Sequence, residues 1–356
     1  MFSKAINYMI GLSTISGETF SGYKIMIVDC TNFSKVGKSG VAGRIHYCIS
    51  MFQLAVEQAI VSTNKKGETF KNFAINEFEI FIGDRIYCNA PGILYVKKYG
   101  AEVIVRYNFG AMPVYKNKKA KTPIDVLAWA RKGNKSVKLI SCTVLTRDRT
   151  GAVLKGRLIA IKLPDDKARE AQQRVKLEYK KATTKTHLER ARYVIVFTTV
   201  PCEKISNVEV MKLYRLRWQV ELQIKRDKSI AEIDFMKLKK EEGVKSWLLG
   251  HLLAQEIAKR IGRGNYQQSK EMEIEFENTE NETKTRIEQK EAWLIFQLGW
   301  FLLKRAIFSI ETKKVEDIVE EVREEIEKTG RHNRPRALEI FRPRLLRKSR
   351  RRIVSK

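Results

Sequence analysis

The chain has 356 residues, with 69 Lys and Arg against 41 Asp and Glu, so its formal net charge is +28. So large an excess of positive charge favours a polyanionic partner such as nucleic acid. Apolar residues make up 43% of the chain, which is enough for packed cores and excludes wholesale disorder.

The five cysteines lie far apart and include no Cys-x-x-Cys pair, which argues against a zinc ribbon or a disulfide scaffold. The most apolar stretch, residues 292–303, is well short of the ~20 residues needed to cross a bilayer. The N-terminal residues lack the basic and then apolar layout of a signal peptide. We therefore expect a cytoplasmic protein in a reducing environment, with no membrane contact.

Short apolar segments separated by turn residues dominate the first 108 residues. Strands are predicted at residues 25–30, 44–50, 78–84 and 102–107. Residues 52–62 are expected to form a helix or a strand extension, and residues 91–99 have helical spacing. This alternation predicts a layered α/β unit.

The next region contains more strand-like segments, at residues 126–131, 137–146, 153–162 and 192–199. A highly charged helical stretch, residues 165–184, interrupts them. We interpret this region as a β-rich insertion. After it, Ser206 and Glu209 have the Ser-x-x-Glu spacing of a capping box, which predicts a long helix running past Lys228.

The C-terminal third is predicted to be helical and basic. A helix at residues 247–261 is followed by a polar stretch, residues 267–289, which contains seven Glu and which we expect to be a surface loop. The expected division of the chain is 1–108 for the first part of the core, 109–200 for the insertion, 201–266 for the second part of the core, 267–290 for the loop, 291–330 for C-terminal helices and 331–356 for a basic tail. That tail carries eleven Lys and Arg against one acid, Glu339, a composition that favours contact with phosphates.

Two carboxylates follow largely apolar predicted strands. Asp29 comes after residues 25–28, and Asp84 comes after residues 78–83. Strand ends are where α/β proteins assemble their sites, although a single Asp in such a place is more often a turn former or a helix cap.

The capped helix supplies further charged groups in a Tyr-x2-Arg-x3-Glu-x6-Lys pattern: Tyr214, Arg217, Glu221 and Lys228. On one continuous helix these four side chains share a face. We expect that face to lie beside the buried stripe, at the edge of a cleft. The alternative is an ordinary exposed face in which Arg217 and Glu221 form an i, i+4 pair worth about 0.2 to 0.5 kcal/mol.

These residues resemble the signature of the insertion-sequence-four family of DDE transposases, bacterial and archaeal cut-and-paste enzymes. The segments around Asp29 and Asp84 are similar to those around the first two acidic residues of that family. The resemblance implies an RNase H-like mixed sheet flanked by helices. It also implies an acidic triad of Asp29, Asp84 and Glu221 that binds two Mg²⁺ or Mn²⁺ ions, and a dimer formed on double-stranded DNA at the inverted-repeat ends and the target.

The resemblance also implies that Tyr214, Arg217 and Lys228 grip phosphates near the cleavage point. Arg106, at the end of the strand after Asp84, is a further DNA-binding candidate. Some relatives stack a flipped base on a Trp in the insertion, and this chain has no Trp from residue 132 to residue 217. The candidates to replace it are Tyr193, Phe197 and Trp129. Cys30 and Ile86 depart from the small residues usual in the family at these positions.

Two other functions remain open from the sequence. Residues 32–39 nearly match the Gly-x4-Gly-Lys-Ser phosphate-binding loop, with Asn32 in place of the first Gly, so a nucleotide hydrolase is one alternative. A non-catalytic, basic nucleic-acid-binding protein, such as a decayed or truncated transposase, is the other.

Overall fold

The computed structural model describes residues 19–34, 41–51, 55–63, 65–132, 139–229, 241–276, 296–300 and 302–303. The chain divides into two compact units. The first unit contains the described parts of residues 29–67 and 218–303, and the second contains residues 19–28 and the described parts of residues 68–217. No helix in these described ranges is both long and apolar enough to span a membrane.

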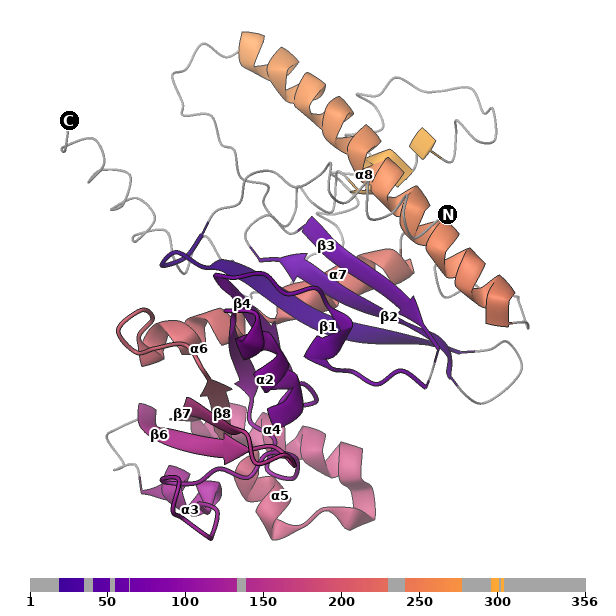
Figure 1. Cartoon of the computed structure of the whole chain (residues 1–356). Coiled ribbons are helices and arrows are strands. Elements are labelled where there is room, and N and C mark those ends of the chain that lie inside the picture. Colours follow the sequence, from indigo (N-terminus) through magenta and orange to yellow (C-terminus); the bar gives the residue numbers. More distant parts are fainter. Residues whose placement is uncertain are drawn as a thin grey trace, which may run out of the picture. The chain divides into compact units, whose positions relative to one another are not determined.

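Eight strands form one mixed sheet in the hydrogen-bonded order β3-β2-β1-β4-β5-β8-β7-β6 (Figure 1). Their bounds are Lys24–Ser34 (β1), Val41–Ser50 (β2), Ala55–Ser62 (β3), Glu79–Gly83 (β4), Glu102–Arg106 (β5), Leu139–Arg147 (β6), Val153–Lys162 (β7) and Tyr193–Thr198 (β8). With the helices beside it, this sheet confirms the predicted α/β class and is consistent with an RNase H-like core.

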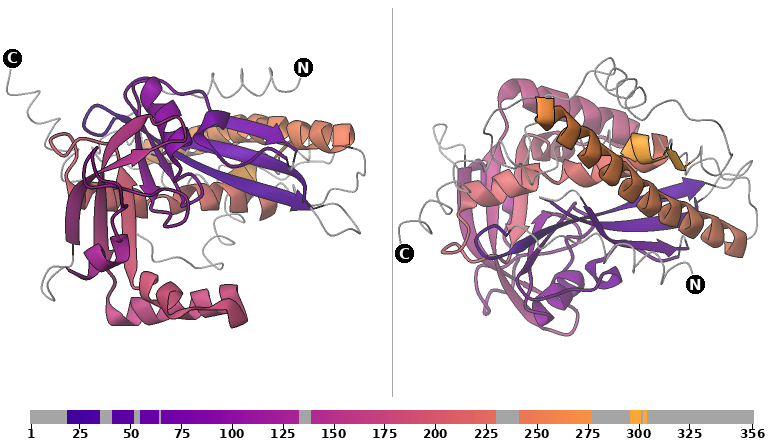
Figure 2. Two further views of the ribbon diagram at one scale, coloured as in Figure 1. Left: turned by 60° about the horizontal axis from the view of Figure 1, so that its bottom comes forward. Right: turned by 90° about the horizontal axis from the view of Figure 1, so that it is seen from above.

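The helices of the described residues are of very different lengths. They are α2 (Ala90–Lys98), α3 (Val126–Arg131), α4 (Asp165–Tyr179), α5 (Lys185–Arg190), α6 (Asn207–Arg215), α7 (Trp218–Ser229) and α8 (Glu241–Phe276), with short 3-10 turns at Phe70–Asn72 (η1) and Lys180–Ala182 (η2). In the second unit, α4 and α5 lie side by side and extend beyond β6, β7 and β8 (Figure 2, left).

The second unit is built on buried parallel strands. The first residues of β1 pair in parallel with β4, and β4 pairs in parallel with β5. Every residue of β4 is buried, as expected for a strand covered on both faces. β8 pairs antiparallel with β5 and with β7, and β7 pairs antiparallel with β6. Helix α6 packs against β5 and β8, so its position follows from these strands.

The first unit contains the β2–β3 hairpin and the long helix α8, which packs on both strands. Gly43 of β2 lies against α8, where a Cβ would meet Leu248 at 3.4 Å. Near the middle of α8, Ala258 packs against Phe296 in a small buried cluster.

Several predicted elements differ from the structure. Residues 126–131 form helix α3 and not a strand, because Asp125 caps them by accepting hydrogen bonds from two backbone N–H groups. Residues 55–62 are a strand, which settles the ambiguity at that segment. Residues 267–276 belong to α8 and not to a loop. The rest of the predicted loop, most of the predicted C-terminal helical region at 291–330 and the basic tail lie outside the described residues.

Candidate functional site

Asp84 lies in a tight turn immediately after β4. Its Oδ1 accepts a hydrogen bond of 2.7 Å from the Ile86 N–H, and the side chain is half-buried. Gly83 is required by this turn, because a Cβ there would lie 2.9 Å from Cβ and Cγ of Tyr87. The turn therefore fixes the direction in which the Asp84 carboxylate leaves the strand.

Asp29 is also half-buried, but it lies within β1 and not at its end, since that strand continues to Ser34. Its Oδ1 accepts a hydrogen bond of 2.8 Å from the Cys30 N–H. The parallel register of β1 and β4 sets Ile27 opposite Ile82. Asp29 follows Ile27 by two positions, and Asp84 follows Ile82 by two positions. Both carboxylates are therefore equally far along the chain from the last residue pair of the ladder.

Helix α6 begins at the predicted capping box and ends near the predicted motif. Ser206 accepts a hydrogen bond from the Glu209 N–H, and the Glu209 carboxylate accepts one from the Ser206 N–H. The helix stops at Arg215, and Leu216 and Arg217 donate tight i→i−3 hydrogen bonds before α7 begins at Trp218. The prediction of one continuous helix from Ser206 past Lys228 is therefore wrong, and so is the single shared face that it implied.

Four predicted site residues of the second unit interact around the Tyr214 hydroxyl. Burial raises the pKa of the Tyr214 phenol above its ordinary value, while the positive charges of Arg106 and Arg217 oppose the rise and Asp84 adds to it. Arg217 is also hydrogen-bonded to this hydroxyl. Two guanidinium groups and a carboxylate, from the end of β5, the turn after β4 and the residue before α7, thus act electrostatically on one phenol, and we call these four residues the Tyr214 cluster.

The other two motif residues lie on α7 in the first unit. Glu221 is exposed, at the start of the helix. Lys228 is half-buried, and its Nζ lies 5.4 Å from the centre of the Phe33 ring of β1, a cation–π distance. Since side chains alternate along a strand, Phe33 and Asp29 are on the same face of β1.

A cavity of about 150 Å³ opens in the second unit beside Arg85, the residue after Asp84. The described residues that line it include no acid. The Arg190 guanidinium lies 4.2 Å from the centre of the Phe109 ring, and the rings of Tyr179 and His187 are stacked 4.5 Å apart. The lining includes the arginines Arg85, Arg106 and Arg190 and the aromatic residues Phe109, Tyr179 and Tyr193. We refer to it as the arginine–aromatic cavity.

Of the three residues considered as replacements for a stacking Trp, only Tyr193 lines this cavity. Phe197 is completely buried in the sheet, where its ring lies against Gly156. Trp129 lies on the short helix α3. Tyr193, itself only 9% exposed, is thus the one of the three with some of its surface on this cavity.

The carboxylates have the donor chemistry of a magnesium or manganese site, but the described residues do not contain a group of three Asp, Glu, His or Cys that is arranged to hold a metal ion. Asp29 and Asp84 each use Oδ1 for a backbone N–H, and each has a second carboxylate oxygen. All-oxygen ligands are those that Mg²⁺ prefers. The carboxylate groups of these residues are therefore suitable ligands for a hard divalent ion. That they assemble around such an ion is a proposal.

A comparison with protein-family models matches residues 21–257 to the family described as the transposase DDE domain. The match covers well over half of the chain and includes every predicted site residue. The chain belongs to the transposase DDE domain family.

Relatives of this DDE-domain protein include transposases of insertion sequences. The transposase for insertion sequence element IS421 of Escherichia coli is 28% identical over 250 residues, covering 68% of this chain and 66% of that protein. The transposase for element IS231F of Bacillus thuringiensis subsp. israelensis is 33% identical over 93 residues, which is 24% of this chain and 20% of that one. The match thus spans slightly less than two thirds of the IS421 protein.

Among solved structures, the piggyBac transposase synaptic complex with hairpin DNA is similar, with 9% identity and a TM-score of 0.42, covering 84% of this chain and 57% of that one.

Sequence reasoning missed the arginine–aromatic cavity. Arg85 and Arg190 are ordinary members of a very basic sequence, and Phe109 and Tyr179 lie far from them along the chain. One local signal was present, because Arg85 directly follows a candidate catalytic carboxylate.

Proposed function

We propose that this DDE-domain protein is a DNA transposase of the insertion-sequence-four type, which cuts DNA at the ends of an insertion sequence and transfers the cut strand to a target. Family membership supports this reaction class. The single observation that supports it best is the cluster around the Tyr214 hydroxyl, because it joins Asp84 to two phosphate-binding candidates, Arg106 and Arg217. The site of action would be the DNA of a prokaryotic cytoplasm.

In this proposal Asp29, Asp84 and Glu221 hold two Mg²⁺ or Mn²⁺ ions. When bound, such ions activate a water or a 3′-hydroxyl and stabilise the leaving oxygen. In cleavage the water oxygen bonds to phosphorus while the phosphorus–O3′ bond breaks, and the freed 3′-oxygen takes a proton. In transfer that 3′-hydroxyl attacks a target phosphodiester in the same way.

Tyr214, Arg217, Lys228 and Arg106 would position the phosphate. Arg217 offers a planar pair of donors to two phosphate oxygens, whereas Lys228 acts as a point charge. Tyr214 stays neutral at ordinary pH because its pKa is raised by burial, so its hydroxyl is available as a hydrogen-bond donor.

The first unit supports the inclusion of Glu221. On β1, Asp29 and Phe33 are separated by about 13 Å of strand. On α7, Glu221 and Lys228 are separated by about 10 Å, two helical turns, and therefore share a face. Because Lys228 lies over Phe33, α7 reaches the face of β1 that carries Asp29, and Glu221 is on the same helix.

We further propose that the arginine–aromatic cavity receives an unpaired nucleotide of the substrate DNA. Its aromatic rings suit a base, and its three arginines suit the attached phosphate. Tyr193 then takes the part that a Trp has in some relatives.

The decisive experiment is cleavage of DNA carrying the element's own flanking repeats, with Mg²⁺ or Mn²⁺, by wild type and by Glu221→Gln. We expect the variant to retain DNA binding and to lose cutting by at least about 100-fold, as for removal of a group that acts only in the transition state. Glu242→Gln, an equal charge change at an exposed position of α8, is the matched control and should cut normally.

The same assay addresses the alternatives and the assembly. A wild-type protein that binds DNA and never cuts with either metal would be a non-catalytic binding protein. ATP binding would favour the phosphate-loop alternative, but Asn32 to Ser34 of that segment belong to β1, and residues 35–39 lie outside the described residues. Light scattering of the protein with and without end DNA tests the proposed dimer on DNA.

A further inference from the structure

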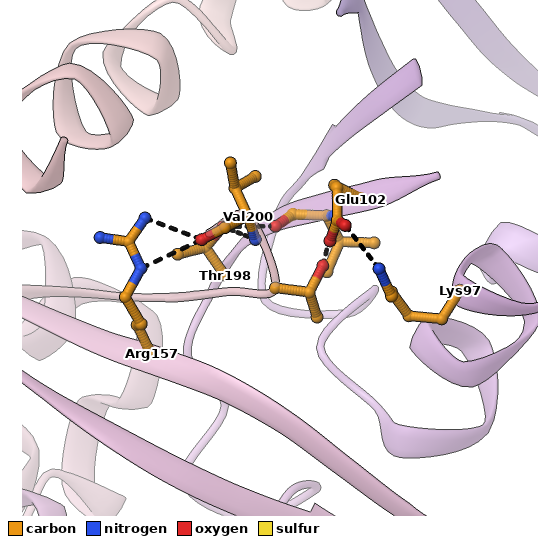
Figure 3. A network of polar contacts seen from close by, with 7 residues as sticks. Lys97, Glu102, Arg157, Thr198 and Val200 are labelled. Carbon is orange, nitrogen blue, oxygen red and sulfur yellow. Dashed lines mark hydrogen bonds and ion pairs between the residues drawn. The ribbon is translucent and has the colours of Figure 1, made fainter. Parts of the chain in front are cut away.

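Arg157 of β7 binds the connection between β8 and α6. Its Nε and Nη2 donate hydrogen bonds of 3.1 and 2.8 Å to the Val200 carbonyl, and Nη2 donates another of 3.0 Å to the Ile205 carbonyl. Its Nη1 donates to Oδ1 of Asn207, the first residue of α6. Figure 3 shows the guanidinium directed at the Val200 carbonyl.

The same connection is attached to β5 at its beginning. The Thr198 hydroxyl donates a hydrogen bond of 2.7 Å to the Val103 carbonyl and accepts one of 3.1 Å from the Val200 N–H. The Val103 N–H in turn donates to the Thr199 hydroxyl at 3.0 Å. Strands β5 and β7 therefore fix both ends of the chain segment that leads into α6, and Figure 3 shows the contacts at its beginning.

Holding this loop with Arg157 costs desolvation free energy. Arg157 donates to two carbonyl oxygens and an amide oxygen, and no carboxylate forms an ion pair with it among the described residues. Burial lowers the pKa of its guanidinium, which shows the cost of desolvating the charge. An apolar side chain would fill the space at less cost, but only a planar group with five donors holds three acceptors in one fixed arrangement.

The helix that begins at this anchor ends at the Tyr214 cluster. Asn207 and Tyr214 are seven residues apart, or about 10 Å along the helix axis. Asn207 is also held by a hydrogen bond of 2.8 Å from its Nδ2 to Ser141 Oγ of β6. A rigid helix transmits a displacement of its first turn to its last, so the anchor determines where Tyr214 and Arg217 lie relative to Arg106 and Asp84.

We propose that Arg157 is a positioning residue for DNA cleavage, acting through α6 on Tyr214 and Arg217. The inference rests on the proposed transposase function. In this proposal Arg157, in the β-rich region, contributes to DNA cleavage without contacting DNA.

The test compares Arg157→Lys with Arg147→Lys. Arg147 of β6 also donates to two backbone carbonyls, those of Lys118 and Ala120, so both variants keep the charge and lose the same kind of interaction. Fluorotyrosine placed at position 214 reports the environment of the phenol by ¹⁹F NMR, with Tyr95 labelled as a second reporter. DNA cleavage and DNA binding are measured on the same unlabelled variants.

We expect Arg157→Lys to shift or broaden the position-214 resonance and leave that of position 95 unchanged. We expect cleavage to fall between about 10- and 100-fold, the range for a displacement of the order of 1 Å in an active site, with DNA affinity almost unchanged. Arg147→Lys should change none of these. A role in stability alone would lower the melting temperature of the Arg157 variant without moving the resonance.

An unchanged resonance at position 214 in folded Arg157→Lys would overturn the proposal, as would normal cleavage by that variant. If Arg157→Lys does not fold, Asn207→Ala removes one acceptor of the anchor and must move the same resonance for the proposal to stand. Failure of wild type to cut DNA would refute the proposed function, whereas the NMR comparison would still decide whether Arg157 positions Tyr214.

Discussion

Protonation of His46 in β2 is coupled to the folding stability of the first unit. Burial, together with the charges of Lys66 and Arg44, lowers the pKa of its imidazole from 6.5 to about 4. Its Nε2 forms a hydrogen bond of 2.8 Å with Ser62 Oγ. Between pH 6.5 and 4 the unfolded chain binds a proton at His46 that the folded chain does not bind, so folding stability falls as the pH falls through this window.

From this residue we expect the free energy of unfolding to be lower at pH 5 than at pH 7 by roughly 2 kcal/mol at most. Urea unfolding of wild type and His46→Gln at both pH values measures it, since Gln keeps a polar partner for Ser62 and does not titrate. The pH dependence should be weaker in the variant, and identical pH dependences would contradict the assignment.

Gly156 of β7 is the other residue whose substitution has a definite expected cost. A Cβ at this position would meet the Phe197 ring and would lie 2.8 Å from the Thr198 carbonyl oxygen. Because Phe197 is completely buried, it has no free space to move into. We expect Gly156→Ala to destabilise the protein by about 1 to 3 kcal/mol, the usual cost of overpacking. Gly110→Ala, where a Cβ meets only ordinary contacts, is the control, and equal denaturation midpoints for the two variants would refute the argument.

At the scale of elements, Gly250 of α8 and Gly299 of the segment 296–300 form a contrasting pair of glycines. At Gly250 nothing lies within 4 Å of an added Cβ, so Gly250→Ala should stabilise the helix by up to about 1 kcal/mol. At Gly299 an added Cβ would collide with the Ala258 carbonyl of α8, so Gly299→Ala should separate the two segments. Thermal unfolding of both variants measures the contrast, and two changes of the same sign would show that residues 296–300 do not pack on α8 as described.

The elements predicted correctly are those whose signals are local. Ser206 and Glu209 predicted the start of α6, and the apolar runs predicted β4, β5, β7 and β8. The end of α6 was missed because no Gly or Pro marks it and Leu216 and Arg217 both favour helix; Leu216 and Trp218 are buried where the helix is interrupted.

Part of the candidate site could likewise be predicted from local signals. Asp84 was predicted from its place after a strand, and Tyr214 and Arg217 from their spacing; in the structure Asp84, Arg217 and Arg106 all influence the Tyr214 phenol electrostatically. Arg157 and the arginine–aromatic cavity depend on strand pairing between residues 40 or more positions apart, which no local pattern encodes.

At the scale of the whole molecule, the two units share the predicted site residues between them. Asp29, Glu221 and Lys228 belong to the first unit, and Asp84, Arg106, Tyr214 and Arg217 to the second. Two of the places where the chain passes from one unit to the other are next to motif residues, between Val28 and Asp29 and between Arg217 and Trp218, whereas a third lies between Gly67 and Glu68.

The net charge of +28 is a property of the whole molecule, and the long-range attraction of the protein to DNA depends on this summed charge. Residues 331–356 carry eleven Lys and Arg and one Glu, a net charge of 11 − 1 = +10. Each phosphate neutralised by the protein releases counterions, which makes the logarithm of the DNA affinity fall with the logarithm of the salt concentration by about 0.9 per contact. The slope of this salt dependence therefore reports how many phosphates the protein contacts.

We expect a variant whose eleven tail cations are replaced by Gln to bind DNA more weakly at low salt and to show a shallower salt dependence, by about 0.9 for each lost phosphate contact. Fluorescence anisotropy of labelled end DNA over a range of salt concentrations measures both slopes. The tail keeps its length in this variant, so only charge is changed. Since the tail lies outside the family match at residues 21–257, metal-dependent cutting at saturating protein should persist. Equal slopes for the two proteins would mean that the tail does not contact DNA and that the charge of the remaining chain supplies the attraction.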